Sequence, residues 1–99
     1  MKKIETSLDG AFIIEPQVFG DVRGWFYESY SKQKMHNIGI DVEFVQDNRS
    51  FSAQQGTLRG LHCQTPPMAQ TKLLTCLRGR IMDVAVDIRR GSPTYMQWT

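Results

Sequence analysis

The segment 80–89 constrains the fold most, because from Met82 on its side chains alternate between apolar and polar or small with a period of two. Such alternation is typical of a β-strand with one buried face. The apolar face would carry Met82, Val84, Val86 and Ile88, and the opposite face Asp83, Ala85 and Asp87. The tight connection at Arg78-Gly79-Arg80 predicts that this strand forms a hairpin with the segment before it.

Most of the remaining sequence also favours strands. The segments concerned are short, rich in β-branched or aromatic residues, and bounded by turn residues; they are 11–15, 25–30, 43–51, 57–64 and 72–78, with a further strand starting at 94–99. Two glycines and an aspartate predict a turn over 19–24. One helix is predicted over 31–39, with Ser31 as N-cap and Gly39 closing the C-terminus.

We therefore predict an all-β fold with one short helix in a single domain, residues 1–99. Antiparallel strands must close or cover their edges, and a β-barrel or jelly roll does so. The sequence stops after Trp98-Thr99, inside strand-like material. We expect the domain to be partial, that is truncated, with an edge that needs a partner.

Composition excludes several function classes. The formal net charge of the 99 residues is +2 and no run of Lys or Arg occurs, so nucleic acid is not an expected partner. No apolar stretch approaches the ~18 residues of a membrane span, and no signal peptide follows Met1, so we expect a cytoplasmic protein without membrane contact. The two cysteines and the two histidines, His36 and His62, form no recognisable metal motif, so we expect no metal and no cofactor.

Polar groups gather in two neighbouring segments. Gln46 and Asn48 are two residues apart and would share one face of a strand, which is either a ligand-lined lumen or a solvated surface. Arg59 and His62 are three apart and would face opposite ways in a regular strand. Gly60 lies between them, and a bulge there would turn both side chains into the lumen. A lone histidine is otherwise more often structural.

Lys72 is the other charged candidate in this region. It opens the predicted strand 72–78. Lysine on a strand edge commonly protects against aggregation. Inside a lumen the same ammonium would be a fixed cation beside a developing oxyanion.

Five motifs in this order and spacing resemble the dTDP-4-dehydrorhamnose 3,5-epimerase family. The motifs are FGDVRG at 19–24, FVQDN at 44–48, LRGLHCQ at 58–64, AQTKL at 69–73, and DVAVDIR with GSPT over 83–94. The match covers nearly the whole chain, and five linked motifs are far more specific than any one of them. The resemblance implies a cupin-type jelly roll that is usually a homodimer and needs no metal.

The resemblance also implies an activity and a role for each matching residue. The family inverts C3 and C5 of a dTDP-linked 4-keto-6-deoxyhexose in dTDP-rhamnose synthesis. His62 would be the general base, a role that suits a side chain titrating near neutral pH. Lys72 would stabilise the enolate, and Arg59 would bind the diphosphate. Gln46, Asp47 and Asn48 belong to the nucleotide-sugar site, and Phe19, Arg23 and Glu28 resemble residues that family members lend to the neighbouring subunit's nucleotide site.

Two departures from the family pattern affect the expected activity. Cys63 stands where the family usually has an aromatic residue. The family's proton-donating tyrosine and the aspartate that orients the base lie beyond position 99, so we expect weak or absent turnover by the 99-residue chain. The alternative function is a non-catalytic, truncated module that binds a nucleotide sugar or takes part in assembly.

Overall fold

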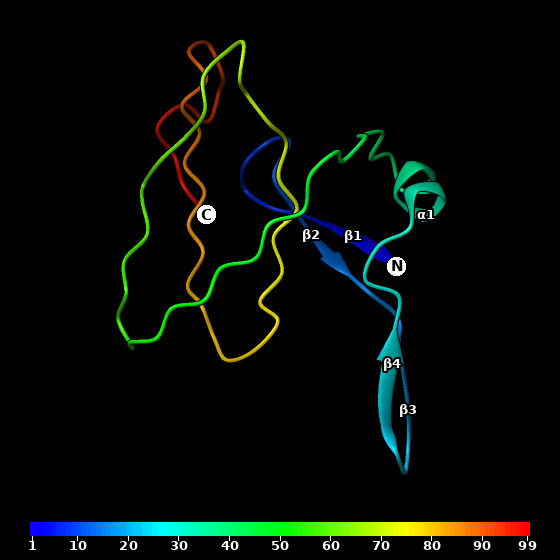
Figure 1. Cartoon of the computed structure of the whole chain (residues 1–99). Helices are drawn as coiled ribbons and strands as arrows, with labels where there is room; N and C mark the ends of the chain where they lie inside the picture. Colours follow the sequence, from blue (N-terminus) through cyan, green and yellow to red (C-terminus); the bar gives the residue numbers. More distant parts are fainter. The chain divides into compact units, whose positions relative to one another are not determined.

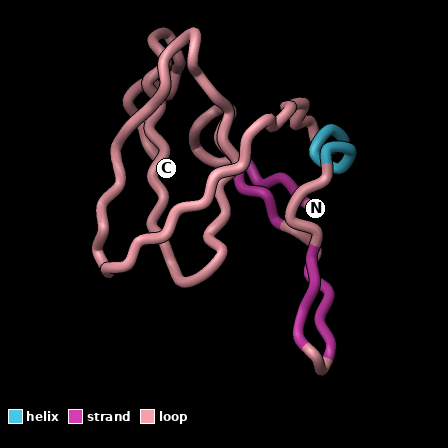
Figure 2. Tube along the Cα trace, viewed as in Figure 1, coloured by secondary structure: helices cyan, strands magenta, loops and turns pink.

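A computed structural model describes all residues from 1 to 99 and consists of two compact units. Unit 1 contains residues Met1–Asp41 and Cys76–Thr99, and unit 2 contains Val42–Thr75. Every element of regular secondary structure belongs to unit 1. The elements are four short strands and one helix, as Figures 1 and 2 show. The structure contains no helix whose length and hydropathy would let it cross a bilayer.

The strands pair into two antiparallel sheets of two strands each. Strand β1 (Lys2–Glu5) pairs with β2 (Phe12–Glu15), and the register places Ile4 opposite Ile13. Strand β3 (Val18–Asp21) pairs with β4 (Gly24–Tyr27) as a hairpin. The predicted strand at 11–15 is thus confirmed, and it ends before Pro16, as a residue without a backbone N–H requires. The predicted strand at 25–30 is confirmed up to Tyr27, whereas the sequence reading missed β1.

The turn predicted over 19–24 is shorter than expected. Its first three residues continue β3, and only Val22 and Arg23 form the turn. Gly24 follows with φ 138°, in a region that favours glycine, and then opens β4. Asp21 and Gly24 therefore flank the turn, as is typical of these residue types, but the turn itself is shorter than the predicted range 19–24.

Helix α1 (Lys32–Asn37) confirms the helix prediction and both of its boundary residues. Ser31 is extended and its hydroxyl accepts a hydrogen bond from Lys34 N at 3.3 Å, which satisfies one of the unpaired N–H groups of the first turn. Gly39 has φ 82° just beyond the C-cap. Met35 is only 2% exposed and, together with Leu8 and Ile40, forms the buried apolar core of unit 1.

The strands predicted over 43–51, 57–64, 72–78 and 80–89 are not formed. Residues 42–75 include no helix or strand, and the segments on either side of Gly79 do not pair, so the predicted hairpin there is wrong. The one local exception is a bridge between Val86 and Trp98, where 85–87 and 96–99 exchange backbone hydrogen bonds. A period of two tells which side chains would share a face, but a strand also needs a partner with which to form a ladder.

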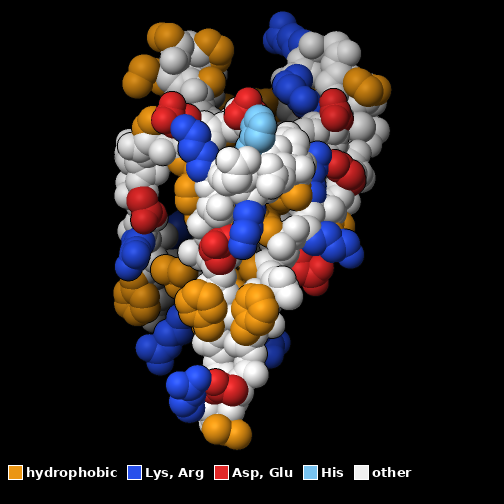
Figure 3. Space-filling model, turned by 90° about the vertical axis from the view of Figure 1, so that its right-hand side faces the viewer, with side chains coloured by type: hydrophobic (Ala, Val, Ile, Leu, Met, Phe, Trp, Pro, Cys, Tyr) orange, Lys and Arg blue, Asp and Glu red, His pale blue; other side chains and the backbone are white.

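Large apolar side chains are therefore exposed in both units. Figure 3 shows hydrophobic side chains at the surface of one face. Those of unit 2 include Val45, Phe51, Leu58, Leu61 and Leu74. The structure is thus mostly short strands and extended chain with one helix, and its small sheets do not close into a barrel.

Candidate functional site

Unit 2 holds six of the nine predicted site residues, and all six are exposed: Gln46, Asp47, Asn48, Arg59, His62 and Lys72. Gln46 Nε2 donates to Asn48 Oδ1 at 3.0 Å. The two amides are therefore joined by a hydrogen bond, although the strand on whose face we expected them is not formed.

Arg59 is held by local contacts in unit 2. Its Nε donates to Ser52 Oγ and its terminal nitrogen donates to the carbonyl oxygen of Phe51, both at 3.0 Å. These bonds direct the guanidinium toward the segment that follows the Gln46–Asn48 pair. A planar guanidinium has five donors, so contacts with Ser52 and Phe51 leave further donors for an anion.

Gly60 sets the path of the chain between Arg59 and His62. Its φ is 110°, where side-chain-bearing residues are strained. A Cβ placed on Gly60 would lie 2.9 Å from His62 Nδ1 and 3.3 Å from His62 N, so the imidazole folds back over the glycine. The strand bulge that we predicted at Gly60 is not formed, because the segment around it belongs to no strand, although the glycine has a positive φ. No hydrogen bond or ion pair joins His62 to Lys72 or Arg59, so their convergence stays a prediction.

Unit 1 contains the other three predicted residues on and beside the β3–β4 hairpin. Phe19 and Arg23 line an open groove of about 430 Å³ over one part of the hairpin, together with Trp25 and Phe26. The rings of Trp25 and Tyr27 stack at a centroid distance of 5.3 Å. The register places Phe19 and Phe26 on one face of the hairpin and Trp25 and Tyr27 on the other, with a cation at its tip.

Asp21 orients that cation, and sequence reasoning missed it. Arg23 donates from its backbone N at 2.8 Å and from its guanidinium to both carboxylate oxygens of Asp21. The side-chain hydrogen bonds from Arg23 lower the pKa of Asp21, and the same pair raises the pKa of Arg23. The available signal was an aspartate two residues before Arg23 at the start of a turn, because an aspartate side chain there commonly accepts a hydrogen bond from the backbone two residues on.

Glu28 lies just after β4 and points toward helix α1. Its Oε1 is 3.0 Å from Lys34 Nζ. Phe19, Glu28 and Lys34 line a small cavity of about 50 Å³ together with Met1 and Gln17. Sequence reasoning gave no role to Lys34. It lies six residues after Glu28 with the start of a helix between the two, so neither strand nor helix periodicity predicts that they meet.

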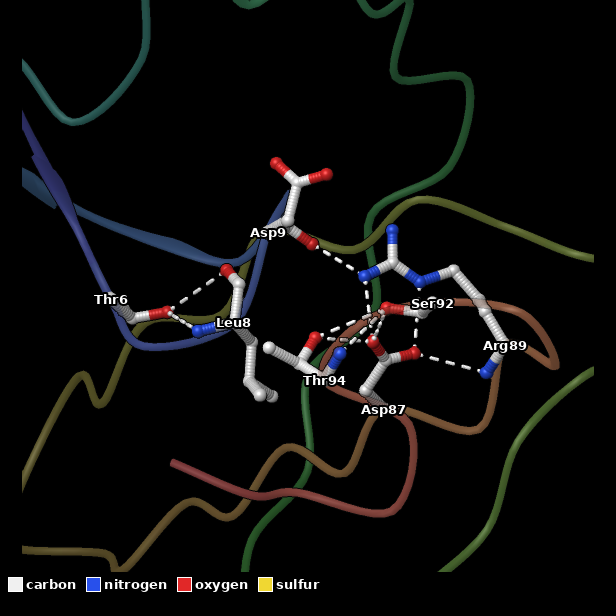
Figure 4. Close-up of polar contacts among 7 residues, drawn as sticks. All are labelled: Thr6, Leu8, Asp9, Asp87, Arg89, Ser92 and Thr94. Atoms are coloured by element: carbon white, nitrogen blue, oxygen red, sulfur yellow. Dashed lines mark hydrogen bonds and ion pairs between the residues drawn. The ribbon is translucent and has the colours of Figure 1, made fainter.

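A further polar cluster centres on Asp87, the buried polar residue of unit 1 (Figure 4). Its carboxylate accepts hydrogen bonds from Arg89, Ser92 and Thr94. Arg89 also donates to the carbonyl oxygen of Asp9 at 2.7 Å, which ties the loop after β1 to the turn that follows residue 87. The side-chain hydrogen bonds from Arg89, then those from Ser92 and Thr94, hold the pKa of Asp87 far below its ordinary range.

Comparison with known proteins decides the family. The family model described as dTDP-4-dehydrorhamnose 3,5-epimerase matches residues 5–99. The chain belongs to this family. It is 50% identical over 99 residues to the dTDP-4-dehydrorhamnose 3,5-epimerase of Shigella flexneri, a match that covers 99% of this chain and 54% of the relative. It is 52% identical over 96 residues to the enzyme of the same name from Methanothermobacter thermautotrophicus, with 97% of this chain and 51% of the relative covered.

A solved member of the epimerase family has the same backbone arrangement. The crystal structure of dTDP-4-dehydrorhamnose 3,5-epimerase from Bacillus anthracis, with TDP and PPi bound, matches with a TM-score of 0.95 and 52% identity. The match covers 99% of this chain and 56% of that one. The chain thus spans about half the length of the relatives it matches, and the resemblance seen in the five sequence motifs is confirmed.

Proposed function

We propose that this chain carries part of the active site of an epimerase that inverts C3 and C5 of a dTDP-linked 4-keto-6-deoxyhexose, in dTDP-rhamnose biosynthesis. One observation carries the proposal. It is the TM-score of 0.95 at 52% identity, over 99% of this chain, to an epimerase crystallised with TDP and PPi. A diphosphate and a nucleotide are the parts of the substrate that such a site must recognise.

The proposed reaction uses the C4 ketone to make the neighbouring C–H bonds acidic. His62 takes the proton from C3 or C5, and the electron pair of that bond moves onto the C4 oxygen to form an enolate. Lys72 stabilises the negative oxygen. A proton then returns to carbon from the opposite face, which inverts the centre and restores the ketone.

The other residues bind and orient the nucleotide sugar. Arg59 contacts the diphosphate, since a planar guanidinium suits phosphate oxygens. The pair formed by Gln46 and Asn48 lines the sugar-nucleotide site, to which Asp47 also belongs. In the proposed homodimer, the hairpin residues Phe19 and Arg23, with Glu28, serve the nucleotide of the neighbouring subunit. The complete fold that we propose for this function is a cupin-type jelly roll. We propose that the protein acts in the cytoplasm and that its reaction needs no metal.

A second function is favoured by the exposure of the catalytic candidates. His62 and Lys72 are both exposed, and no hydrogen bond joins them. A chain in this state binds a nucleotide sugar through Arg59 and the amide pair without moving a proton, so it acts as a binding or assembly module.

Proton exchange distinguishes the two functions. The 99-residue chain is incubated in D₂O with dTDP-4-keto-6-deoxyglucose, and deuterium at C3 and C5 is followed by NMR. We expect slow exchange that is lost in His62→Ala and retained in His36→Ala, the matched control on helix α1. Binding without exchange would support the second function. Full epimerisation at ordinary rates would show that our expectation of weak turnover is wrong.

A further inference from the structure

The ion pair between Glu28 and Lys34 links a proposed nucleotide contact to helix α1. Glu28 Oε1 is buried and accepts no hydrogen bond of good geometry, although Lys34 Nζ lies 3.0 Å away. The Glu28 side chain as a whole is still 43% exposed, so its exposure falls on the remaining atoms. One carboxylate oxygen is thus turned inward beside the ammonium, while the rest of the side chain can meet a ligand.

The backbone of Lys34 is held in place by helix α1. Its backbone N donates to the Ser31 hydroxyl at 3.3 Å, which anchors it in the first turn of α1. The next residue, Met35, is buried in the core of unit 1. Met35 N also donates to Ser31 O at 2.9 Å, and Ile40 N donates to Met35 O at 2.9 Å. The helix backbone beneath the lysine is therefore held at both ends.

A small cavity lies beside the Glu28–Lys34 ion pair and is also lined by a residue of the β3–β4 hairpin. The space of about 50 Å³ is lined by Phe19 of β3 as well as by Glu28 and Lys34. It has room for water but not for a nucleotide ring system. Phe19 and Glu28 thus line the same space, so a change in the Glu28 rotamer would change the room left beside Phe19.

We propose that Lys34 is a positioning residue for nucleotide recognition: its ammonium fixes the Glu28 carboxylate in the rotamer that meets the nucleotide of the dTDP-sugar. This inference rests on the proposed function and names a residue that supports it. Lys34 itself does not touch the nucleotide. Its side chain is 56% exposed, and exposed ion pairs add little to folding stability. Its contribution therefore appears in ligand affinity and not in the stability of the fold.

Calorimetric titration of the 99-residue chain with dTDP tests the inference. We expect Lys34→Gln to weaken dTDP binding by about two- to fivefold, the range that corresponds to a partly exposed charge pair. Lys34→Arg should bind as the wild type does, because a guanidinium can also pair with the carboxylate. Lys2→Gln is the matched control, since it removes an ammonium from another surface ion pair of unit 1, 4.0 Å from Glu15, and should leave affinity unchanged.

A double-mutant cycle separates failure of the inference from failure of the proposed function. If Lys34 acts through Glu28, Lys34→Gln should have no further effect in the Glu28→Gln background. Equal losses in both backgrounds, or wild-type affinity in Lys34→Gln, would overturn the inference and leave the proposed function standing. Wild-type affinity in Glu28→Gln would instead remove Glu28 from the proposed nucleotide site. An absence of dTDP binding by the unmodified chain would overturn the proposed nucleotide recognition and the inference with it.

Discussion

Replacing Gly60 by alanine should damage the proposed base more than it damages the fold. Gly60 has φ 110°, and a residue with a Cβ held in such a region costs about 1–3 kcal/mol. The added Cβ would also lie 2.9 Å from His62 Nδ1, closer than non-bonded carbon and nitrogen atoms approach. Rotation of the imidazole relieves that contact, whereas the 3.3 Å approach to the His62 backbone N requires a shift of a few tenths of an ångström that adds to the loss of stability. The ring, however, must leave its present position.

Gly56→Ala is the matched control within unit 2. Gly56 has φ 79°, and a Cβ built there would meet no atom within 4 Å. The backbone strain is of the same kind, about 1–2 kcal/mol, but no histidine has to move. Both variants should therefore unfold at lower denaturant concentration than the wild type.

Only the substitution at Gly60, two residues before the histidine, should alter the imidazole. The chain has two histidines, so the ring proton signals of His62 can be followed by NMR with His36 as the internal reference. Gly60→Ala should shift the His62 signals and reduce deuterium exchange at C3 and C5, whereas Gly56→Ala should leave both as in the wild type. Unchanged His62 signals in Gly60→Ala, or equal shifts in the two variants, would refute the reasoning.

Three further predictions concern unit 1. Met35→Ala should lower the free energy of unfolding by about 2–5 kcal/mol, measured by urea denaturation, because this core side chain is 2% exposed; the same change at exposed Met96 should have little effect. Ser31→Ala should cost about 1 kcal/mol by the same assay and lower the helical circular dichroism signal, whereas Ser31→Asn should not, because asparagine also caps helices. Asp87→Asn should destabilise the chain at neutral pH. The pKa of Asp87 is lowered in the folded state, so its contribution is complete above about pH 4, where the unfolded carboxyl ionises, and decreases as the pH falls below that value. The difference between wild type and variant should therefore shrink in acid, and a constant difference would contradict this assignment.

The parts of the fold that were predictable from sequence depend on contacts between near neighbours. Ser31 capping, the positive φ of Gly39 and the end of β2 before Pro16 each follow from the conformational limits of one residue and the hydrogen bonds of the next few. The strands expected in 42–90 depend on distant partners. The alternating pattern of that region says nothing about which segment will supply the ladder, and in this chain none does over most of its length.

Asp87 shows how a simple pattern can mislead. The alternation assigns Met82 and Ile88 to the buried face, yet both are exposed, while Asp87 is buried. The carboxylate is satisfied by hydrogen bonds from Arg89, Ser92 and Thr94, and such pairing offsets the cost of taking a charge out of water. The residue types around Asp87 were visible in the sequence. Their convergence depends on a turn geometry that a period of two does not encode.

The candidate site was predictable as a set of residue types, and its present geometry explains why weak turnover is expected. Enzymes gain most from fixed charges when water is excluded from them. Two unit charges 4 Å apart interact by about 1 kcal/mol in bulk water and by about 4 kcal/mol at the effective dielectric constant of about 20 that describes charges in a water-excluded protein site. A difference of about 3 kcal/mol in the stabilisation of an enolate corresponds to about a hundredfold in rate. Lys72 and His62 are exposed in this structure, so the ammonium would act on the enolate at close to its strength in water. The residues that catalyse the proposed reaction and the environment that makes them effective are therefore separate properties, and the sequence motifs report only the first.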